Sequence, residues 1–391
     1  MKNKIKKLIP IKLKRAIKII LQKIKSLPYV LMYNFYKKHT ELNENKVLFL
    51  SSSRDTLSGN FLFIYNELKK YDYELNMNLK SKLNTTRTLK EKRMLCKEMA
   101  ESKYLLVDDF YPIVYALKIR KNQELIQVWH AMGAFKTVGY SRSGKEGAPQ
   151  VKSLTHKNYT KAIVSSPYIR KDYAEAFGID ISKICSTGIP RTDIFFDKNY
   201  EKNIKEKIYT KYPMLKEKKV ILFAPTFRGN GQKTAYYNFN LLDFNLLKEK
   251  LKDEYVFILK IHPFVKNLNK LPKDDDFYLN LSNEREINDL LFVTDILITD
   301  YSSVIFENAL LNNKVVFFVP DLKEYINSRD FYYEFNKYTY GDVTYKIDEL
   351  INSIKNPTQD TKKLKEFKEY FCSSCDGNST KRFVEELILK R

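Results

Sequence analysis

Short apolar runs recur along this chain, and longer stretches of mixed polar and apolar residues separate them. The runs have the length of buried strands, and the intervening stretches are long enough for crossover helices. This alternation predicts βαβ units and parallel sheets. In the first half we expect a helix at 61–68 and strands at 47–51, 104–107, 125–129, 162–165 and 184–187. In the second half we expect strands at 220–224, 255–261, 296–299 and 315–319.

A Lys-rich polar stretch at 197–218 separates the two series of runs. A chain of 391 residues is long enough for two domains, each with a core of its own. The sequence therefore predicts an α/β fold of two Rossmann-type, doubly wound domains facing a cleft. The parts that we expect are a basic amphipathic helix at 1–40, an N-terminal domain at 41–205, a C-terminal domain at 206–376 and a closing helix at 377–391.

Positive charge is concentrated at the N-terminus. The net charge is +22, and residues 1–38 contribute +12 because they contain twelve Lys or Arg and no Asp or Glu. On a helix, this segment has an apolar stripe made of Ile9, Leu13, Ala16, Ile17, Ile20, Ile24 and Leu27. The opposite side carries Lys7, Lys14, Lys18 and Lys25. No apolar run reaches the length of a membrane span, so we expect this helix to lie on an anionic membrane surface.

Two other interpretations of the tail stay open: a solvated basic helix packed on its own domain, and an arm that binds nucleic acid. Aromatic residues near the end of the tail favour the membrane interface over nucleic acid. The four Cys residues are too few for a disulfide framework, and no cleavable signal peptide precedes them, so we expect a reducing cytoplasm. The pair Cys372 and Cys375 lacks the second pair of a structural zinc site, and we expect no metal there.

Polar residues that can act in catalysis or ligand binding follow several of the predicted strands. Parallel sheets bind ligands at the carboxyl ends of their strands, so these positions are the first candidates. His130 follows the strand predicted at 125–129, and an imidazole there can act as a general base. The alternative is a core His bonded to backbone. Gly133 and Lys136 follow in the same turn, and we assign them to the acceptor side of the site.

The predicted C-terminal domain supplies three further clusters at strand ends. Arg228 can hold a phosphate bidentately, with Thr226 donating a hydroxyl bond beside it. His262 follows Lys260 at the end of the next strand and suits a leaving diphosphate. The third cluster begins a helix, where small hydroxyl residues and free backbone amides favour an anion. It contains Thr299, Asp300, Ser302, Ser303 and Glu307, and Glu307 is placed to accept from ribose hydroxyls.

The segments WHAMGAFK, ILFAPTFR, KIHP and DILITDYSSVIFENAL, in this order, resemble the CDP-glycerol glycerophosphotransferase family, which builds teichoic acids and related capsule polymers in bacteria. The resemblance extends from about residue 45 to the C-terminus and includes GIPRTD at 188–193. It implies a GT-B-like fold and peripheral association with the cytoplasmic face of the membrane. It also implies transfer of a polyol phosphate from a CDP-activated donor to a lipid-linked acceptor.

The resemblance also suggests partners and roles. The donor would be CDP-glycerol, our first expectation, or CDP-ribitol, and the acceptor an undecaprenyl-diphosphate-linked saccharide or polymer. His130 would deprotonate the acceptor, whereas His262, Arg228 and the serines at 302 and 303 would contact the donor diphosphate. The acceptor hydroxyl would attack the β-phosphorus directly and release CMP. This reaction needs no cofactor, and its dependence on a divalent metal is left open.

Two other functions stay open from the sequence. The first is a GT-B transferase that uses a CMP-sugar, because sialyltransferases also place a His-Pro pair and a Ser-rich phosphate cap at strand ends. The second is a non-enzymatic, basic membrane-binding protein. Whether the protein makes teichoic acid or capsule, and primes or extends a polymer, is not decided by the sequence.

Overall fold

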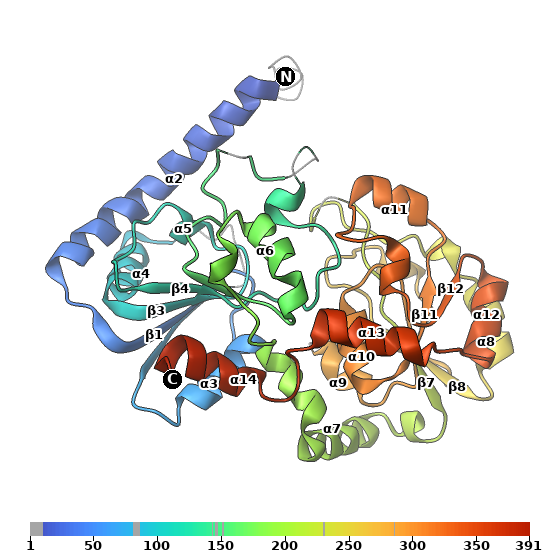
Figure 1. Cartoon of the computed structure of the whole chain (residues 1–391). Helices are drawn as coiled ribbons and strands as arrows, with labels where there is room; N and C mark the ends of the chain where they lie inside the picture. Colours follow the sequence, from blue (N-terminus) through green and yellow to red (C-terminus); the bar gives the residue numbers. More distant parts are fainter. Residues whose placement is uncertain are drawn as a thin grey trace. The chain divides into compact units, whose positions relative to one another are not determined.

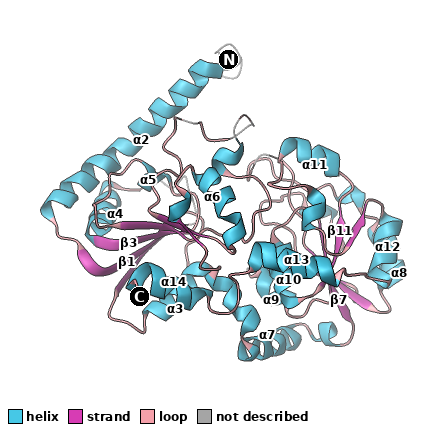
Figure 2. Cartoon of the chain, viewed as in Figure 1, coloured by secondary structure: helices cyan, strands magenta, loops and turns pink. Residues whose placement is uncertain are grey.

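The computed structural model describes residues 11–80, 87–142, 144, 148–150, 152–229, 231–284 and 286–391, without the side chains of 11–16 and 18. The chain divides into two compact units, which Figures 1 and 2 show as ribbons. Unit 1 extends to His130 and includes residues 138–191 and 378–391. Unit 2 contains residues 131–137 and 192–377.

Within the described residues, unit 1 has a six-stranded parallel sheet with the order β2-β1-β3-β4-β5-β6. Its strands are β1 (Asn43–Ser51), β2 (Glu74–Leu79), β3 (Ser102–Val107), β4 (Glu124–Gln127), β5 (Lys161–Ile163) and β6 (Ile184–Cys185). Its helices are α2 (Ile11–His39), α3 (Asn60–Leu68), α4 (Leu89–Glu101), α5 (Pro112–Tyr115), α6 (Arg170–Phe177) and α14 (Ser379–Phe383). Apolar side chains of α3 and of the C-terminal segment pack on one face of this sheet.

Unit 2 repeats the design with a different strand order. Its described residues form a six-stranded parallel sheet ordered β12-β11-β10-β7-β8-β9. The strands are β7 (Lys219–Phe223), β8 (Tyr255–Leu259), β9 (Tyr278–Asn280), β10 (Ile296–Thr299), β11 (Lys314–Phe318) and β12 (Asp342–Thr344). The helices are α7 (Lys198–Lys211), α8 (Phe244–Leu251), α9 (Ile287–Leu291), α10 (Val304–Leu311), α11 (Leu322–Ser328), α12 (Ile347–Lys355) and α13 (Thr361–Cys372). This is the strand order of dinucleotide-binding Rossmann folds.

The predicted α/β class and every predicted buried strand are confirmed, with differences of a few residues at the ends. The strand expected at 125–129 ends at Gln127, because Trp129 adopts a positive φ of 47° that a strand cannot contain. Three strands were not predicted: β2, β9 and β12. All three are at sheet edges, and each contains at least one polar residue in place of a continuous apolar run of typical strand length.

The predicted domain limits need three corrections. The closing helix belongs to unit 1, because Phe383, Val384 and Ile388 are buried in its core and Tyr104 donates a 2.7 Å hydrogen bond to the Ile388 carbonyl. Residues 192–205 belong to unit 2, where Tyr200 donates a 2.7 Å bond to Asp289 of α9. Residues 131–137 also belong to unit 2, which moves the predicted acceptor-side residues out of the first domain.

The N-terminal segment is helical over α2, as expected, and carries an exposed apolar stripe. We define the α2 stripe as the exposed side chains Ile17, Ile20, Leu21, Ile24, Leu27, Leu31 and Phe35. The predicted stripe members before Ile17, and the lysines at 7, 14 and 18, lie outside the described residues or side chains. Toward its end α2 packs on unit 1, where Tyr33 is buried and donates to Gln123. Among the described helices, none combines the length and the apolar content required to cross a bilayer.

Candidate active site

Both sheets reverse their strand order at one point, and ligands of doubly wound sheets bind beyond the strand ends there. In unit 1 the reversal lies between β1 and β3, which end at Ser51 and Val107. In unit 2 it lies between β7 and β10, which end at Phe223 and Thr299. The residues that follow these four strands therefore form the candidate sites.

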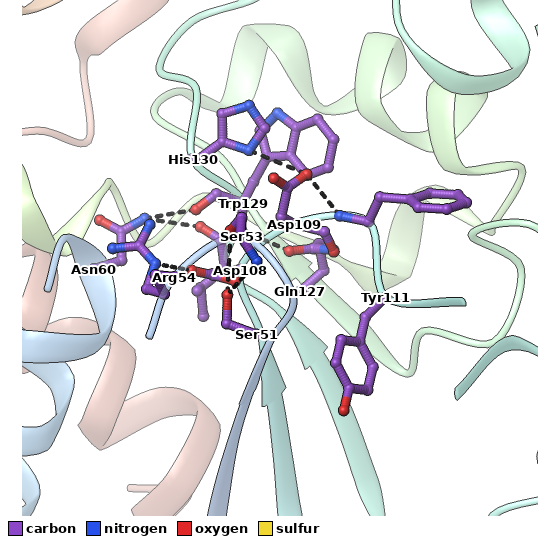
Figure 3. Close-up of polar contacts among 12 residues, drawn as sticks. Ser51, Ser53, Arg54, Asn60, Asp108, Asp109, Tyr111, Gln127, Trp129 and His130 are labelled. Carbon is purple, nitrogen blue, oxygen red and sulfur yellow. Dashed lines mark hydrogen bonds and ion pairs between the residues drawn. The ribbon is translucent and has the colours of Figure 1, made fainter. Parts of the chain in front are cut away.

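His130 is exposed at the unit 1 site, next to a carboxylate. Its Nδ1 lies 3.6 Å from Oδ1 of Asp109, and its side chain is 47% exposed (Figure 3). This distance is an ion-pair contact and too long for a direct hydrogen bond. An imidazole that gains a proton here would be stabilised by the neighbouring negative charge, as a general base requires. The predicted core-His alternative is therefore wrong for His130.

The turn before His130 is held by side chains from other elements. Asn60 at the start of α3 donates 2.9 Å hydrogen bonds to the carbonyls of Val128 and Trp129. The Trp129 amide in turn donates to the side chain of Gln127 at 2.8 Å. These bonds satisfy backbone groups that the positive φ of Trp129 removes from the sheet. The His130 backbone is therefore fixed although its side chain is exposed.

Below His130, Arg54 and Asp108 form a buried ion pair that joins the ends of β1 and β3 (Figure 3). The Asp108 side chain is 1% exposed. Burial raises the pKa of Asp108, while the charge of Arg54 and a hydrogen bond from Ser51 oppose this rise. Arg54 was not among the predicted site residues. The run of serines that precedes it directly after β1 is the signal that could have identified this position.

In unit 2, Arg228 is enclosed by carboxylates. It contacts both oxygens of Asp321 at 2.6 and 2.9 Å and lies 2.9 Å from Asp300, and it donates to the Thr226 carbonyl. Asp300 also accepts a 2.7 Å bond from the Thr226 amide, which ties the ends of β7 and β10 together. The guanidinium donors that we expected to hold a phosphate are thus engaged by the protein. In this structure Arg228 positions the loop around Asp300.

His262 follows β8 and is neutral at pH 7. Burial, together with the positive charges of Lys136 and Lys260, lowers its pKa to about 4. Its Nδ1 accepts a 3.1 Å hydrogen bond from the Phe264 amide, so the neutral ring carries its proton on Nε2. The ring can therefore contact a diphosphate as a neutral hydrogen-bond donor and not as an imidazolium. Lys260 donates to the backbone carbonyls of Ser282 and Glu284, which assigns it to loop support.

Lys136, in the segment 131–137, lies close enough to His262 and Asp300 to interact electrostatically with both. Burial lowers its pKa to about 8, Asp300 opposes this effect, and Arg329 and Arg228 add to it. The segment is packed tightly, because a Cβ on Gly133 would lie 2.3 Å from the Phe306 ring and Gly133 has a φ of 66°. Lys136 and Gly133, predicted on the acceptor side, therefore lie in unit 2, which also contains the predicted donor-binding residues.

The helix start at α10 is partly as predicted. Ser302 and Ser303 are half-buried before Val304, and the Ser303 side chain makes no capping bond within the helix. Thr299 is fully buried and donates to the Ala224 carbonyl at 2.7 Å, so its hydroxyl joins two strands. Glu307 is 2% exposed and lies near Tyr340 and Cys372. A ligand cannot reach the side chain of Thr299 or of Glu307 while α10 stays packed. This argues against the predicted contacts of these two residues with the donor.

Three more residues of the two sites carry charge that the sequence analysis did not use for the reaction. These are Asp109 beside His130, Asp321 beside Arg228, and Arg329, which donates to the Gly229 carbonyl at 2.6 Å. Their roles depend on contacts between distant segments. Over the described ranges, no three His, Cys, Asp or Glu side chains group closely enough to hold a metal ion.

Comparison with known proteins identifies a family. A sequence model of "CDP-Glycerol:Poly(glycerophosphate) glycerophosphotransferase" matches residues 31–389. A teichoic acid poly(ribitol-phosphate) polymerase of Bacillus spizizenii is 49% identical over 350 residues, which cover 89% of this chain and 56% of the relative. The ribitol-phosphate polymerase TarK of Staphylococcus aureus is 43% identical over 348 residues, covering 88% of this chain and 68% of the relative. This chain thus spans about half the length of the first relative.

Relatives that use glycerol phosphate are less similar. The poly(glycerol phosphate) polymerase of Bacillus spizizenii is 32% identical over 381 residues, covering 88% of this chain and 92% of the relative. Among solved structures, the wall teichoic acid polymerase TagF matches with a TM-score of 0.74 and 23% identity, covering 97% of this chain and 96% of that chain. This structural likeness confirms the GT-B-like fold of two Rossmann-like sheets.

The buried pair in unit 1 generates a test. We expect Arg54→Met to lower the free energy of unfolding by about 3–5 kcal/mol at pH 7.5, because it leaves the Asp108 carboxylate buried without a partner. An Asp with a raised folded pKa destabilises the protein as pH rises above the unfolded pKa of about 3.9. The deficit should therefore shrink at pH 5, as measured by urea unfolding.

The control for this prediction is the double variant Arg54→Met with Asp108→Asn, which removes the charge. It should recover most of the stability at pH 7.5 and lose the pH-dependent part of the deficit. An equal loss for Arg54→Met at both pH values would contradict a role for the Asp108 charge.

Proposed function

Because this chain belongs to the CDP-glycerol:poly(glycerophosphate) glycerophosphotransferase family, we propose that it transfers a polyol phosphate from a CDP-activated donor in teichoic acid synthesis. The observation that carries this proposal is the 49% identity to a poly(ribitol-phosphate) polymerase along 89% of the chain. The same observation favours CDP-ribitol as donor over the CDP-glycerol that we first expected, because the glycerol-phosphate polymerase of the same organism is only 32% identical.

In the proposed reaction, His130 accepts the proton of an acceptor hydroxyl, and Asp109 stabilises the imidazolium that forms. The hydroxyl oxygen forms a bond to the β-phosphorus of the donor, and the bond from that phosphorus to the bridging oxygen breaks. CMP leaves with the electron pair of that bond. No cofactor is consumed, since the CDP-polyol is itself a substrate.

Unit 2 would bind the donor diphosphate. Lys136 supplies a positive charge, and Nε2 of His262 supplies a neutral hydrogen-bond donor. Ser302 and Ser303 offer hydroxyls at the positive end of α10. Arg228 and Asp300 hold the loop that carries these groups, and Thr226 joins it to β7. Charge neutralisation of this kind is the main requirement of phosphoryl transfer.

One assay of CMP release tests both the identity of the donor and the role of His130 as general base. We expect the purified protein to release CMP from CDP-ribitol faster than from CDP-glycerol, and to release none from CMP-sialic acid, in the presence of a lipid-linked saccharide acceptor. His130→Ala should slow release by about 10²–10⁴-fold, because it removes the general base. Chromatography of the nucleotides measures CMP, and mass spectrometry identifies the product.

His39→Ala serves as the matched control, since His39 lies at the exposed end of α2 and should leave the rate unchanged. Release from CMP-sialic acid alone would support the sugar-transferase alternative. Full activity of His130→Ala would remove the proposed base, and no turnover with any donor would favour a non-enzymatic protein.

The charge on Lys136 predicts how donor binding depends on pH. Lys136 is charged below its pKa of about 8 and neutral above it, so CDP should bind more weakly as pH rises from 7 to 9. CDP itself remains fully ionised over this range, since its terminal phosphate has a pKa near 6. Lys136→Arg should bind CDP with little pH dependence, because the guanidinium stays charged. Calorimetric titration measures both.

Lys273→Arg is the control, because Lys273 is exposed in the same unit and the variant should keep the wild-type pH dependence. If CDP affinity of the wild type is constant from pH 7 to 9, Lys136 does not supply charge to the diphosphate.

We further propose that the α2 stripe holds the protein on the anionic, cytoplasmic face of the membrane. The triple change Ile20→Ser, Ile24→Ser and Leu31→Ser should weaken binding to phosphatidylglycerol vesicles at least about 100-fold, since each buried side chain of this size is worth about 1.5–3 kcal/mol. Sedimentation with vesicles measures the bound fraction. Serine at three other exposed apolar positions of unit 1 (Leu62, Leu89 and Met94) should leave it unchanged. Equal loss in both triple variants would contradict a specific role for α2.

A further inference from the structure

Unit 1 contains a pocket that the proposed phosphoryl transfer does not use. Its volume is about 520 Å³, and its walls come from α2, from the segment around α5 and from the residues near Leu154. Figure 1 shows α2 passing beside α5 in this unit. Small-molecule sites in proteins have volumes of about 300–1,000 Å³, so the pocket is large enough for part of a ligand.

The lining of the pocket is apolar with a basic margin. Leu21 and Tyr29 of α2 line it together with Phe110, Ile113 and Leu154. Lys23 and Lys25 also line it, and among the described residues of its wall there is no Asp or Glu. Apolar walls with nearby ammonium groups suit a molecule that joins a hydrocarbon chain to an anionic group.

One end of the pocket lies next to the proposed base. Phe110 lines the pocket, and its backbone amide donates a 2.6 Å hydrogen bond to Oδ1 of Asp109. The same oxygen lies 3.6 Å from Nδ1 of His130. A ligand whose chain fills the pocket would therefore present its head group near the imidazole.

The pocket is also continuous with the α2 stripe. Leu21 belongs both to the stripe and to the pocket wall. A hydrocarbon chain can thus pass from the surface of α2 into the pocket along apolar side chains. Tyr115 in the pocket wall is held in place by its hydroxyl, which contacts His156 and Tyr159 within the core at 3.3 and 3.1 Å.

We propose that this pocket binds the hydrocarbon chain of the lipid-linked acceptor next to its head group. The inference rests on the proposed function for the identity of the acceptor, and on the pocket geometry for its place. The chain is bound by burial of apolar surface, and Lys23 and Lys25 attract the phosphate groups that join chain and saccharide. Recognition of the acceptor thus includes its lipid and not its saccharide alone.

The test uses two acceptors with the same saccharide, one carrying a farnesyl diphosphate group and one a methyl group, in solution without vesicles. Leu154→Asp places a charge in the pocket, and Ala116→Trp fills it. Both variants should raise KM for the farnesyl acceptor at least about tenfold. They should leave kcat, KM for CDP-ribitol and KM for the methyl acceptor close to wild type.

Leu62→Asp is the matched control, because Leu62 and Leu154 have the same side chain and similar exposure, 36% and 38%, and Leu62 lies outside the pocket. It should behave as wild type. An unchanged KM for the farnesyl acceptor in both pocket variants would overturn the proposal, and so would an equal rise for both acceptors.

Direct binding separates this inference from the proposed function. Farnesyl phosphate should bind wild type and Leu62→Asp in calorimetric titration, and bind Leu154→Asp at least about tenfold more weakly. If the wild type transfers no polyol phosphate but shows this pattern, the proposed function fails and the lipid pocket stands. If all three proteins bind farnesyl phosphate equally, or none does, the pocket proposal is wrong whatever the activity.

Discussion

An ion pair between Arg and Asp closes each point where a sheet reverses its strand order, and both candidate sites depend on it. In unit 1 Arg54, after β1, pairs with Asp108 at the end of β3. In unit 2 Arg228, after β7, pairs with Asp300 at the end of β10. A buried pair of this kind contributes little net stability, but breaking it is costly, so it fixes which strand ends lie together. The reacting groups then occupy the loops that these pairs position.

The interior of the fold could be predicted from the sequence because buried strands are continuous apolar runs. Three of the four edge strands could not, since β2 has polar residues at alternate positions and β9 and β12 are only three residues long. For the site, the sequence predicted that His130 and His262 follow strands and that Ser303 precedes a helix, and the structure places all three in this way. The prediction failed for Arg228, because Asp321 lies far along the chain and nothing in the local sequence shows that the two pair.

Protonation states were also beyond the sequence. His130 and His262 both follow strands, yet one is exposed beside a carboxylate and the other is buried beside two lysines. Burial and the two positive charges keep His262 neutral. The membership of segment 131–137 in unit 2 could not be predicted from the sequence either. It depends on contacts with distant residues: Phe135 stacks on Phe331, and Tyr338 donates to the Ala134 carbonyl.

The charges of unit 2 constrain how a diphosphate can be held there. Lys136, Arg228 and Arg329 are cations, and two of their charges are offset by Asp300 and Asp321. These five groups leave one net positive charge, which is less than the charge of a bound diphosphate. The remainder must come from dipoles, and the structure offers Nε2–H of His262 and the positive end of the α10 helix dipole. Because such donors keep their strength as pH rises while Lys136 loses its charge, in the proposed donor site the lysine would set the pH range of binding and the dipoles its geometry.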